Sequence, residues 1–171
     1  GTSALGINTA ASNTAVGRSV LAANTTGTAN VAVGALAMDG NVEASYSTAV
    51  GMEALSGLLT GDSNTAIGRE SMKVATSASS NVGVGRDTLQ TLSTGSSNVA
   101  IGENSLDAGT VARYNTAVGY NSLSTEIDGD YSVAIGYAAL GTQESDAENQ
   151  AVFNTAVGGY AGNGLTTGIK N

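Results

Sequence analysis

Apolar and polar residues alternate in a repeat of 17 residues along most of this 171-residue chain. A nonapeptide with limited variation begins at residues 13, 30, 47, 64, 81, 98, 115, 132 and 154. The first eight starts are spaced by 17 residues, and the ninth follows the eighth by 22. We number the nonapeptide as positions 1 to 9 of a rung and the connection after it as positions 10 to 17. A constant period of this kind is the signature of stacked repeats.

Three positions of the nonapeptide hardly vary. Position 5 is always Gly, which indicates a positive φ or an approach too close for a Cβ atom. Position 4 is always β-branched and favours a strand, and position 9 is Leu or Met until Gly162 replaces it in the last copy. The position-5 residues are Gly17, Gly34, Gly51, Gly68, Gly85, Gly102, Gly119, Gly136 and Gly158. The position-4 residues are Val16, Val33, Val50, Ile67, Val84, Ile101, Val118, Ile135 and Val157. The apolar position-9 residues are Leu21, Met38, Leu55, Met72, Leu89, Leu106, Leu123 and Leu140.

The remaining strand positions define two faces. Position 3 is Ala in every copy except Gly83, and position 2 is either Thr or Val. Because side chains alternate along a strand, positions 2 and 4 share one face and position 3 takes the other. We therefore expect each rung to be a short strand, a Gly turn, a second short strand ending at position 9, and a surface connection. Stacking would place Val/Ile on Val/Ile and Leu on Leu along a continuous interior. The predicted fold is all-β, a parallel β-solenoid or β-roll of about ten rungs in one repeat domain over residues 1–171.

The ends and the long connection depart from the strict repeat. Residues 2–10 fit the template as a degenerate rung with Gly6 at position 5. The extra residues of the last connection lie within 141–153, where we expect a surface insertion; a binding loop is the alternative. Neither end carries a polar helix or a divergent terminal repeat, which predicts either a longer parent protein or end-to-end stacking.

Large side chains are scarce, since the chain has 24 Gly, six Tyr, one Phe and no Trp. The interior must therefore be thin. Four of the aromatic residues occupy the last position of a connection, which is position 17 except in the longer last connection: Tyr46, Tyr114, Tyr131 and Phe153. We expect them to cover the open side of the stack, and an exposed recognition row is the alternative.

Composition narrows the chemistry. The chain has no Cys and no His, so a disulfide, a thiolate metal site and the commonest general base are all excluded. A net charge of -8 argues against nucleic-acid binding, which needs clustered Lys and Arg. No apolar stretch is long enough to insert into a membrane, and no targeting segment is recognisable.

Three carboxylates form the strongest acidic cluster: Glu126, Asp128 and Asp130. Their oxygens could bind Ca²⁺, but the segment lacks the nonapeptide of calcium-binding rolls and the EF-hand loop, so we expect a solvated turn without metal. No phosphate-loop motif occurs, and no cofactor is expected. The threonines of position 2 alternate irregularly with Val, which argues against an ice-binding array.

Enzymatic activity is not expected. A β-solenoid enzyme acting on polysaccharides would need acids, bases or aromatic residues that converge across rungs. Here Arg18, Arg69 and Arg86 each follow a position-5 Gly and are isolated in sequence, which indicates a rim of charge.

The units Ser132-Val-Ala-Ile-Gly136, Asn98-Val-Ala-Ile-Gly102 and Asn115-Thr-Ala-Val-Gly119 resemble the head repeats of YadA-like trimeric autotransporter adhesins. The resemblance extends from Thr2 to Asn171, although the period here is longer, and similar repeats occur in phage tail-fibre proteins. It implies a left-handed β-roll in a homotrimer, with the Val/Ile and Leu columns filling each roll and the small Ala column at the three-fold. It also implies a non-enzymatic structural or adhesive rod at a cell or virion surface, contacting a host surface, matrix or glycan. A tail fibre or another extracellular filament, extended end to end, is the alternative.

Overall fold

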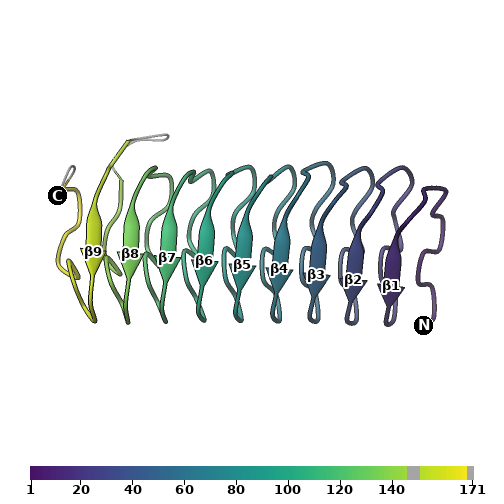
Figure 1. Ribbon diagram of the computed structural model, residues 1–171, viewed down its shortest axis with the longest axis horizontal. Coiled ribbons are helices and arrows are strands. Elements are labelled where there is room, and N and C mark those ends of the chain that lie inside the picture. Colours follow the sequence, from purple (N-terminus) through teal and green to yellow (C-terminus); the bar gives the residue numbers. More distant parts are fainter. Residues whose placement is uncertain (146–150, 169–171) are drawn as a thin grey trace.

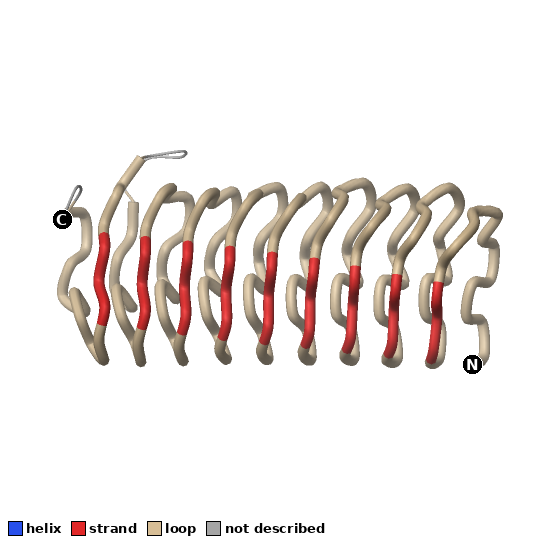
Figure 2. Tube along the Cα trace, in the orientation of Figure 1, coloured by secondary structure: helices blue, strands red, loops and turns tan. Residues whose placement is uncertain are grey.

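The chain folds as a parallel β-solenoid in a computed structural model that describes residues 1–145 and 151–168 (Figure 1). Nine parallel strands lie side by side in chain order, and the described residues contain no helix (Figure 2). The strands are β1 (Thr14–Val16), β2 (Val31–Val33), β3 (Thr48–Val50), β4 (Thr65–Ile67), β5 (Val82–Val84), β6 (Val99–Ile101), β7 (Thr116–Val118), β8 (Val133–Ile135) and β9 (Thr155–Val157). Each strand takes positions 2 to 4 of its rung. The predicted fold class is therefore confirmed.

Residues 2–10 stack on the first full rung without forming a strand. The backbone N–H of Ser19 donates to the carbonyl of Thr2 at 2.8 Å, and the N–H of Leu5 donates to the carbonyl of Val20 at 3.0 Å. The two ends of the described chain lie at opposite ends of the stack (Figure 1).

The prediction of a second strand after the Gly turn is wrong. Positions 7 and 9 have positive φ in rung after rung, as at Glu53 (58°) and Leu55 (51°), which a β-strand does not allow. The backbone still bonds to both neighbouring rungs: Glu53 N donates to Ala35 O, and Leu55 N donates to Ser71 O, each at 3.0 Å. This second wall of the solenoid is therefore a ladder of left-handed turns, which a strand-like sequence pattern does not reveal.

The position-5 glycines are required for two reasons. Their φ lies between 121° and 139°, a region that residues with a Cβ atom rarely adopt. A Cβ atom on Gly102 would also lie only 2.6 Å from the backbone oxygen of Gly119 in the next rung. At Gly102 both the backbone conformation and the close stacking of rungs therefore exclude a side chain.

The leucines of position 9 combine local strain with full burial. Leu89 has a φ of 49°, and the left-handed region costs an ordinary residue roughly 1–2 kcal/mol. Its side chain is completely buried, and burying a Leu stabilises by roughly 1.5–3 kcal/mol. The stabilisation from burial offsets the strain, which explains why Leu is favoured at position 9. In the last rung Gly162 takes the same conformation, with a φ of 65°.

The Val/Ile column faces outward, so its predicted place in the interior is wrong. Val50 and Ile101 are 37% and 41% exposed, whereas Ala49 and Ala100 are fully buried. A Cβ atom on Gly83 would meet the side chains of Ser71, Thr88 and Met72, so position 3 packs across the interior against positions 8 and 9. The position-9 side chains fill most of the thin space between the two walls, and only a small residue fits opposite them. The Ala column therefore lies inside each solenoid and does not form its outer contact face.

Position 1 closes each rung by side-chain hydrogen bonds. The buried Asn98 accepts through its Oδ1 from the backbone N–H of Asn115 at 3.0 Å, and its Nδ2 donates to the carbonyl of Ala112 at 2.7 Å. One side chain thus satisfies a backbone group of its own connection and one at the start of the next rung, as buried polar groups require.

Candidate binding surfaces

The outer face of the sheet is a wall of β-branched residues, which we call the strand wall. The strands pair without register shift, so position 2 lies beside position 2 and position 4 beside position 4 along the stack. Every residue at these two positions is Thr, Val or Ile. The position-4 side chains at the two ends are the most exposed, Val16 at 57% and Val157 at 68%. The strand wall is therefore a long surface without charge, and its side chains are stiff at χ1.

The threonines of position 2 lie on this wall but do not form a continuous row of hydroxyl groups. Thr65 lies beside Val82, and Val99 lies beside Thr116. The irregular alternation in the sequence is thus reproduced in space.

Two ladders of aromatic rings stand on the surface around β7–β9. In the first ladder Tyr114 stacks on Tyr131 with ring centroids 4.8 Å apart, and Tyr131 stacks on Phe153 at 5.1 Å. These rings are 43–50% exposed. The prediction that position-17 aromatics cover the open side of the stack is wrong, because they stand in solvent and cover one another. Tyr46 is 67% exposed, and exposed serines occupy position 17 in the three rungs between it and Tyr114.

The second ladder was missed in the sequence. Tyr120 stacks on Tyr137 at 5.3 Å, and Tyr160 packs edge-on against Tyr137 at 5.0 Å. The hydrogen bond between Tyr160 and Tyr137 is the main cause that raises the pKa of the Tyr160 hydroxyl. The sequence did contain a signal for this ladder, because Tyr120 and Tyr137 both occupy position 6 and lie one repeat apart.

The middle of the solenoid carries a network of ion pairs on its second wall. Lys73 Nζ lies 2.6 Å from Glu53 Oε2 and 3.2 Å from Glu70 Oε2. The hydrogen bond to Glu53, then that to Glu70, raises the pKa of the Lys73 ammonium. Hydrogen bonds from Arg69 and then from Lys73 lower the pKa of the Glu70 carboxyl.

The interpretation of the arginines as isolated is wrong for two of them. Arg69 pairs with Glu70 at 2.5 Å, and Arg86 pairs with Glu103 in the next rung. Glu103 lies 17 residues after Arg86 in the sequence, and the two side chains meet because neighbouring rungs stack.

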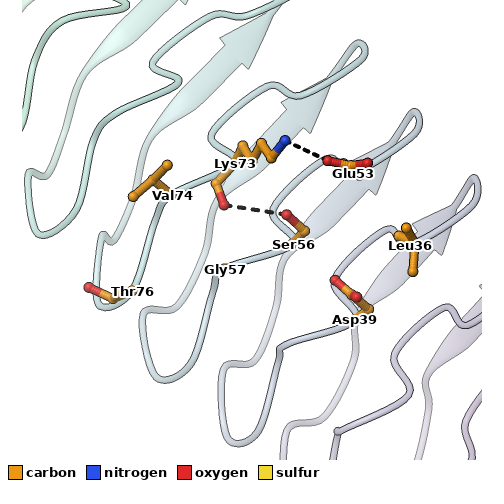
Figure 3. Close-up of a pocket in the computed structure, with 8 residues that line it drawn as sticks. All are labelled: Leu36, Asp39, Glu53, Ser56, Gly57, Lys73, Val74 and Thr76. Atoms are coloured by element: carbon orange, nitrogen blue, oxygen red, sulfur yellow. Dashed lines mark hydrogen bonds and ion pairs between the residues drawn. The ribbon is translucent and has the colours of Figure 1, made fainter.

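An open hollow of about 600 Å³ lies beside this network (Figure 3). Leu36 and Val74 supply apolar lining, and Asp39, Glu53, Ser56 and Lys73 supply polar lining. The Lys73 side chain points toward Glu53, and Asp39 lies on a neighbouring rung of the same hollow (Figure 3). Burial is the main cause that raises the pKa of the Asp39 carboxyl.

The three carboxylates considered as candidate calcium ligands lie in different surroundings. Glu126 is fully buried, Asp128 accepts a hydrogen bond from the Thr110 hydroxyl at 2.6 Å, and Asp130 accepts one from the backbone N–H of Arg113 at 2.7 Å. Burial is the main cause that raises the pKa of Asp130. Within residues 1–145 and 151–168, no group of three or more His, Cys, Asp or Glu is placed to hold a metal ion.

Glu126 belongs to a buried polar cluster, which we call the polar core. Its Oε1 accepts from the backbone N–H of Gly129 at 2.7 Å, and its Oε2 accepts from Gln143 Nε2 at 2.8 Å. Gln143 Oε1 accepts in turn from Asn154 Nδ2 at 2.8 Å. The expected solvated turn is therefore wrong for Glu126, because position 12 faces the interior.

The insertion within 141–153 begins at the polar core. Gln143 is buried, and the backbone N–H of Glu144 donates to Thr166 O at 2.8 Å. Residues 146–150, where a protruding loop was expected, lie outside the described residues. Across the part of the chain that the structure describes, no helix has the length and apolarity to cross a membrane.

Comparison of the chain with protein-family models, with curated proteins and with solved structures finds no match. The proposals below therefore depend on the residues, the geometry and the resemblance of the repeats stated above.

Proposed function

We propose that this chain is a non-enzymatic extracellular rod, structural or adhesive, whose copies associate through the strand wall. A homotrimer is the proposed assembly, by the resemblance of the repeats to adhesin heads. The observation that carries the proposal is the strand wall itself, in register over nine strands and free of charge.

The strand wall is unusual for the surface of a monomer. Monomeric proteins rarely expose contiguous apolar patches larger than a few hundred Å². Side chains such as Ile67 and Ile135, which are 40% and 38% exposed, lose further contact with water when a second copy covers them. Each Å² of apolar surface so buried stabilises by roughly 25 cal/mol. A partner of the same shape and periodicity fits this wall along its whole length.

The surfaces outside the strand wall support the adhesive role. The ion-pair network and hollow lie near β3–β5, and the aromatic ladders stand near β7–β9. Aromatic side chains and Arg are enriched at recognition surfaces. We propose that these regions contact a host surface, matrix component or glycan, on a cell or a virion.

Light scattering tests the assembly. The parent chain is expected to have a mass near three times 16.7 kDa at micromolar concentration. The double variant Ile101→Lys/Val118→Lys, whose residues face each other across β6 and β7, should reduce the mass to that of one chain. Thr94→Lys, on an exposed connection, should leave the mass unchanged.

A folded parent chain with a mass of 16.7 kDa would refute association through the strand wall. Assembly into species that grow with concentration would favour a tail fibre or another extracellular filament instead. The adhesive role is tested separately, by binding to immobilised matrix proteins and a glycan panel. A trimer that binds none of them would be a structural spacer only.

A further inference from the structure

The two tyrosine ladders hold phenol rings in contact on the surface of neighbouring rungs. Tyr114 and Tyr131 have ring planes within 10° and centroids 4.8 Å apart, and Tyr120 and Tyr137 have planes within 14° and centroids 5.3 Å apart. All four rings are 41–50% exposed, so each pair is open to reagents in solution. Backbone hydrogen bonds between rungs, such as Tyr131 N to Arg113 O at 3.2 Å, keep the two members of a pair together.

The composition of the chain directs one-electron oxidation to tyrosine. Cysteine and tryptophan, the other side chains that readily lose one electron, are absent. Methionine instead takes up an oxygen atom and becomes a sulfoxide. Two of the three methionines, Met38 and Met72, are fully buried. The six tyrosines are therefore the main targets of a one-electron oxidant.

We infer that Tyr114–Tyr131 and Tyr120–Tyr137 are sites of oxidative cross-linking, each forming one dityrosine. A peroxidase with hydrogen peroxide removes one electron and one proton from each phenol. The two phenoxyl radicals couple through the carbons ortho to their oxygens, and the two displaced ring hydrogens move to the oxygens as the rings regain aromaticity. Two tyrosines and one hydrogen peroxide thus give one dityrosine and two water molecules.

Proximity gives these pairs their selectivity. Radicals on rings that already touch couple within one molecule, and reactants held in contact have effective concentrations far above those of two proteins in solution. Tyr46 has the serine Ser63 at the same position of the next rung, so its radical has no neighbouring phenol. A cross-link joins two rungs and closes a loop of one repeat, which constrains the unfolded chain as a disulfide does. The ladders would then act as covalent staples in a chain that has no cysteine.

The test uses the folded full chain with a haem peroxidase and hydrogen peroxide. The expected product shows the blue fluorescence of dityrosine, migrates as one chain on a denaturing gel, and is lighter by two hydrogen atoms per bond. Digestion after glutamate separates Tyr114 and Tyr120, which precede Glu126, from Tyr131 and Tyr137, which follow it. The cross-link should hold these two peptides together. The melting temperature of the oxidised protein should rise.

Matched variants locate the reaction. Tyr131→Phe and Tyr137→Phe keep a ring in each ladder but remove the phenol, so the double variant should lose nearly all intramolecular dityrosine. Tyr46→Phe should leave the yield unchanged. Ser63→Tyr places a phenol one rung from Tyr46, at a position whose φ of 60° matches that of the position-17 tyrosines, and should create a third cross-link.

Three results would overturn the inference. They are a parent chain without dityrosine under conditions that oxidise free tyrosine, dityrosine that persists in the double variant, and products that link separate chains only.

Discussion

The central rungs around β3–β5 and the C-terminal rungs around β7–β9 share one backbone but distribute their polar groups in opposite ways. The central rungs carry ion pairs outside, and their buried position 12 is apolar, with Leu58, Ala75 and Leu92. The C-terminal rungs carry aromatic ladders outside, and position 12 is polar in the β7 and β8 rungs, with Glu126 and Gln143.

The backbone contacts between rungs are the same in both regions. Leu55 N donates to Ser71 O at 3.0 Å in the centre, and Leu123 N donates to Ala139 O at 3.0 Å near the C-terminus. The fold is therefore held by the rung-to-rung hydrogen bonds and by the Asn, Ala, Gly and Leu columns. Position 12 and the outward positions are free to change their chemistry from one region to the other.

The largest expected effect comes from breaking the polar core. Glu126→Leu removes the acceptor of the Gly129 N–H and one of the two acceptors of Gln143 Nε2. It makes one of the two polar position-12 residues apolar, as in the central rungs, and leaves Gln143 polar. A buried polar group left without a partner costs about 1–3 kcal/mol, so we expect a loss of about 3 kcal/mol in the free energy of unfolding. Urea unfolding followed by circular dichroism measures it.

The double variant Glu126→Leu/Gln143→Leu sharpens the comparison. It makes both positions apolar, as in the central rungs, and Asn154 Nδ2 keeps its bond to Gly168 O. Replacing both partners of a buried hydrogen bond is far less costly than removing one. At least half of the lost stability should return. If the double variant is less stable than Glu126→Leu, the two interiors are not interchangeable.

The second expected effect concerns the Ala column, which is common to both regions. Ala100→Leu adds volume to a fully buried position between the two walls, and overpacking costs roughly 1–3 kcal/mol. Thr94→Leu adds the same side chain at an exposed connection and should leave stability nearly unchanged. Equal melting temperatures for the two variants and the parent would show that the interior has room to spare.

The sequence was sufficient for the solenoid because the period, the position-5 glycines and the β-branched position 4 each point to stacked rungs. The sequence did not suffice to predict which face of each strand is buried and which is exposed. Alternation assigns Val50 and Ala49 to opposite faces, but it does not say which face is buried. That choice depends on the left-handed turns at positions 7 and 9, which turn the position-9 side chains into the interior, where Met72 lies opposite Gly83 and only a small residue fits at position 3.

The contacts on the surface could be predicted only by comparing the same repeat position in successive rungs. Tyr120 and Tyr137 share position 6, and Arg86 and Glu103 share it as well, so both contacts follow from the period. Glu126 was misplaced because its segment contains three acids and a glycine and has the composition of an exposed turn. Its partner Gln143, one period later, was the signal for a buried hydrogen bond.

A smaller effect is expected from the central ion pairs. Lys73→Gln removes a cation that lies between Glu53 and Glu70 on an exposed surface. Exposed pairs contribute little and are screened by salt. The melting temperature should fall slightly at low ionic strength and match that of the parent at about 1 M salt, where the screening length is roughly 3 Å. A loss that persists in high salt would indicate that packing of the Lys73 stem, rather than its charge, is important.

The smallest expected effect is a gain in stability from Asp107, which lies between the two regions. Its Oδ1 is buried without a hydrogen-bond partner, and burial is the main cause that raises the pKa of this carboxyl above its usual 3.8. A raised pKa in the folded state means that the group stabilises the fold below the unfolded pKa, and that this contribution is lost as the pH rises through the folded pKa. Asp107→Asn should therefore be slightly more stable than the parent at pH 7, by well under about 1 kcal/mol because the residue is only half-buried. The difference should shrink as the pH falls, and thermal unfolding of both proteins from pH 7 to below the usual pKa measures it. An advantage that stays constant over this range would show that the gain comes from the amide's hydrogen bonds and not from the removal of a buried charge.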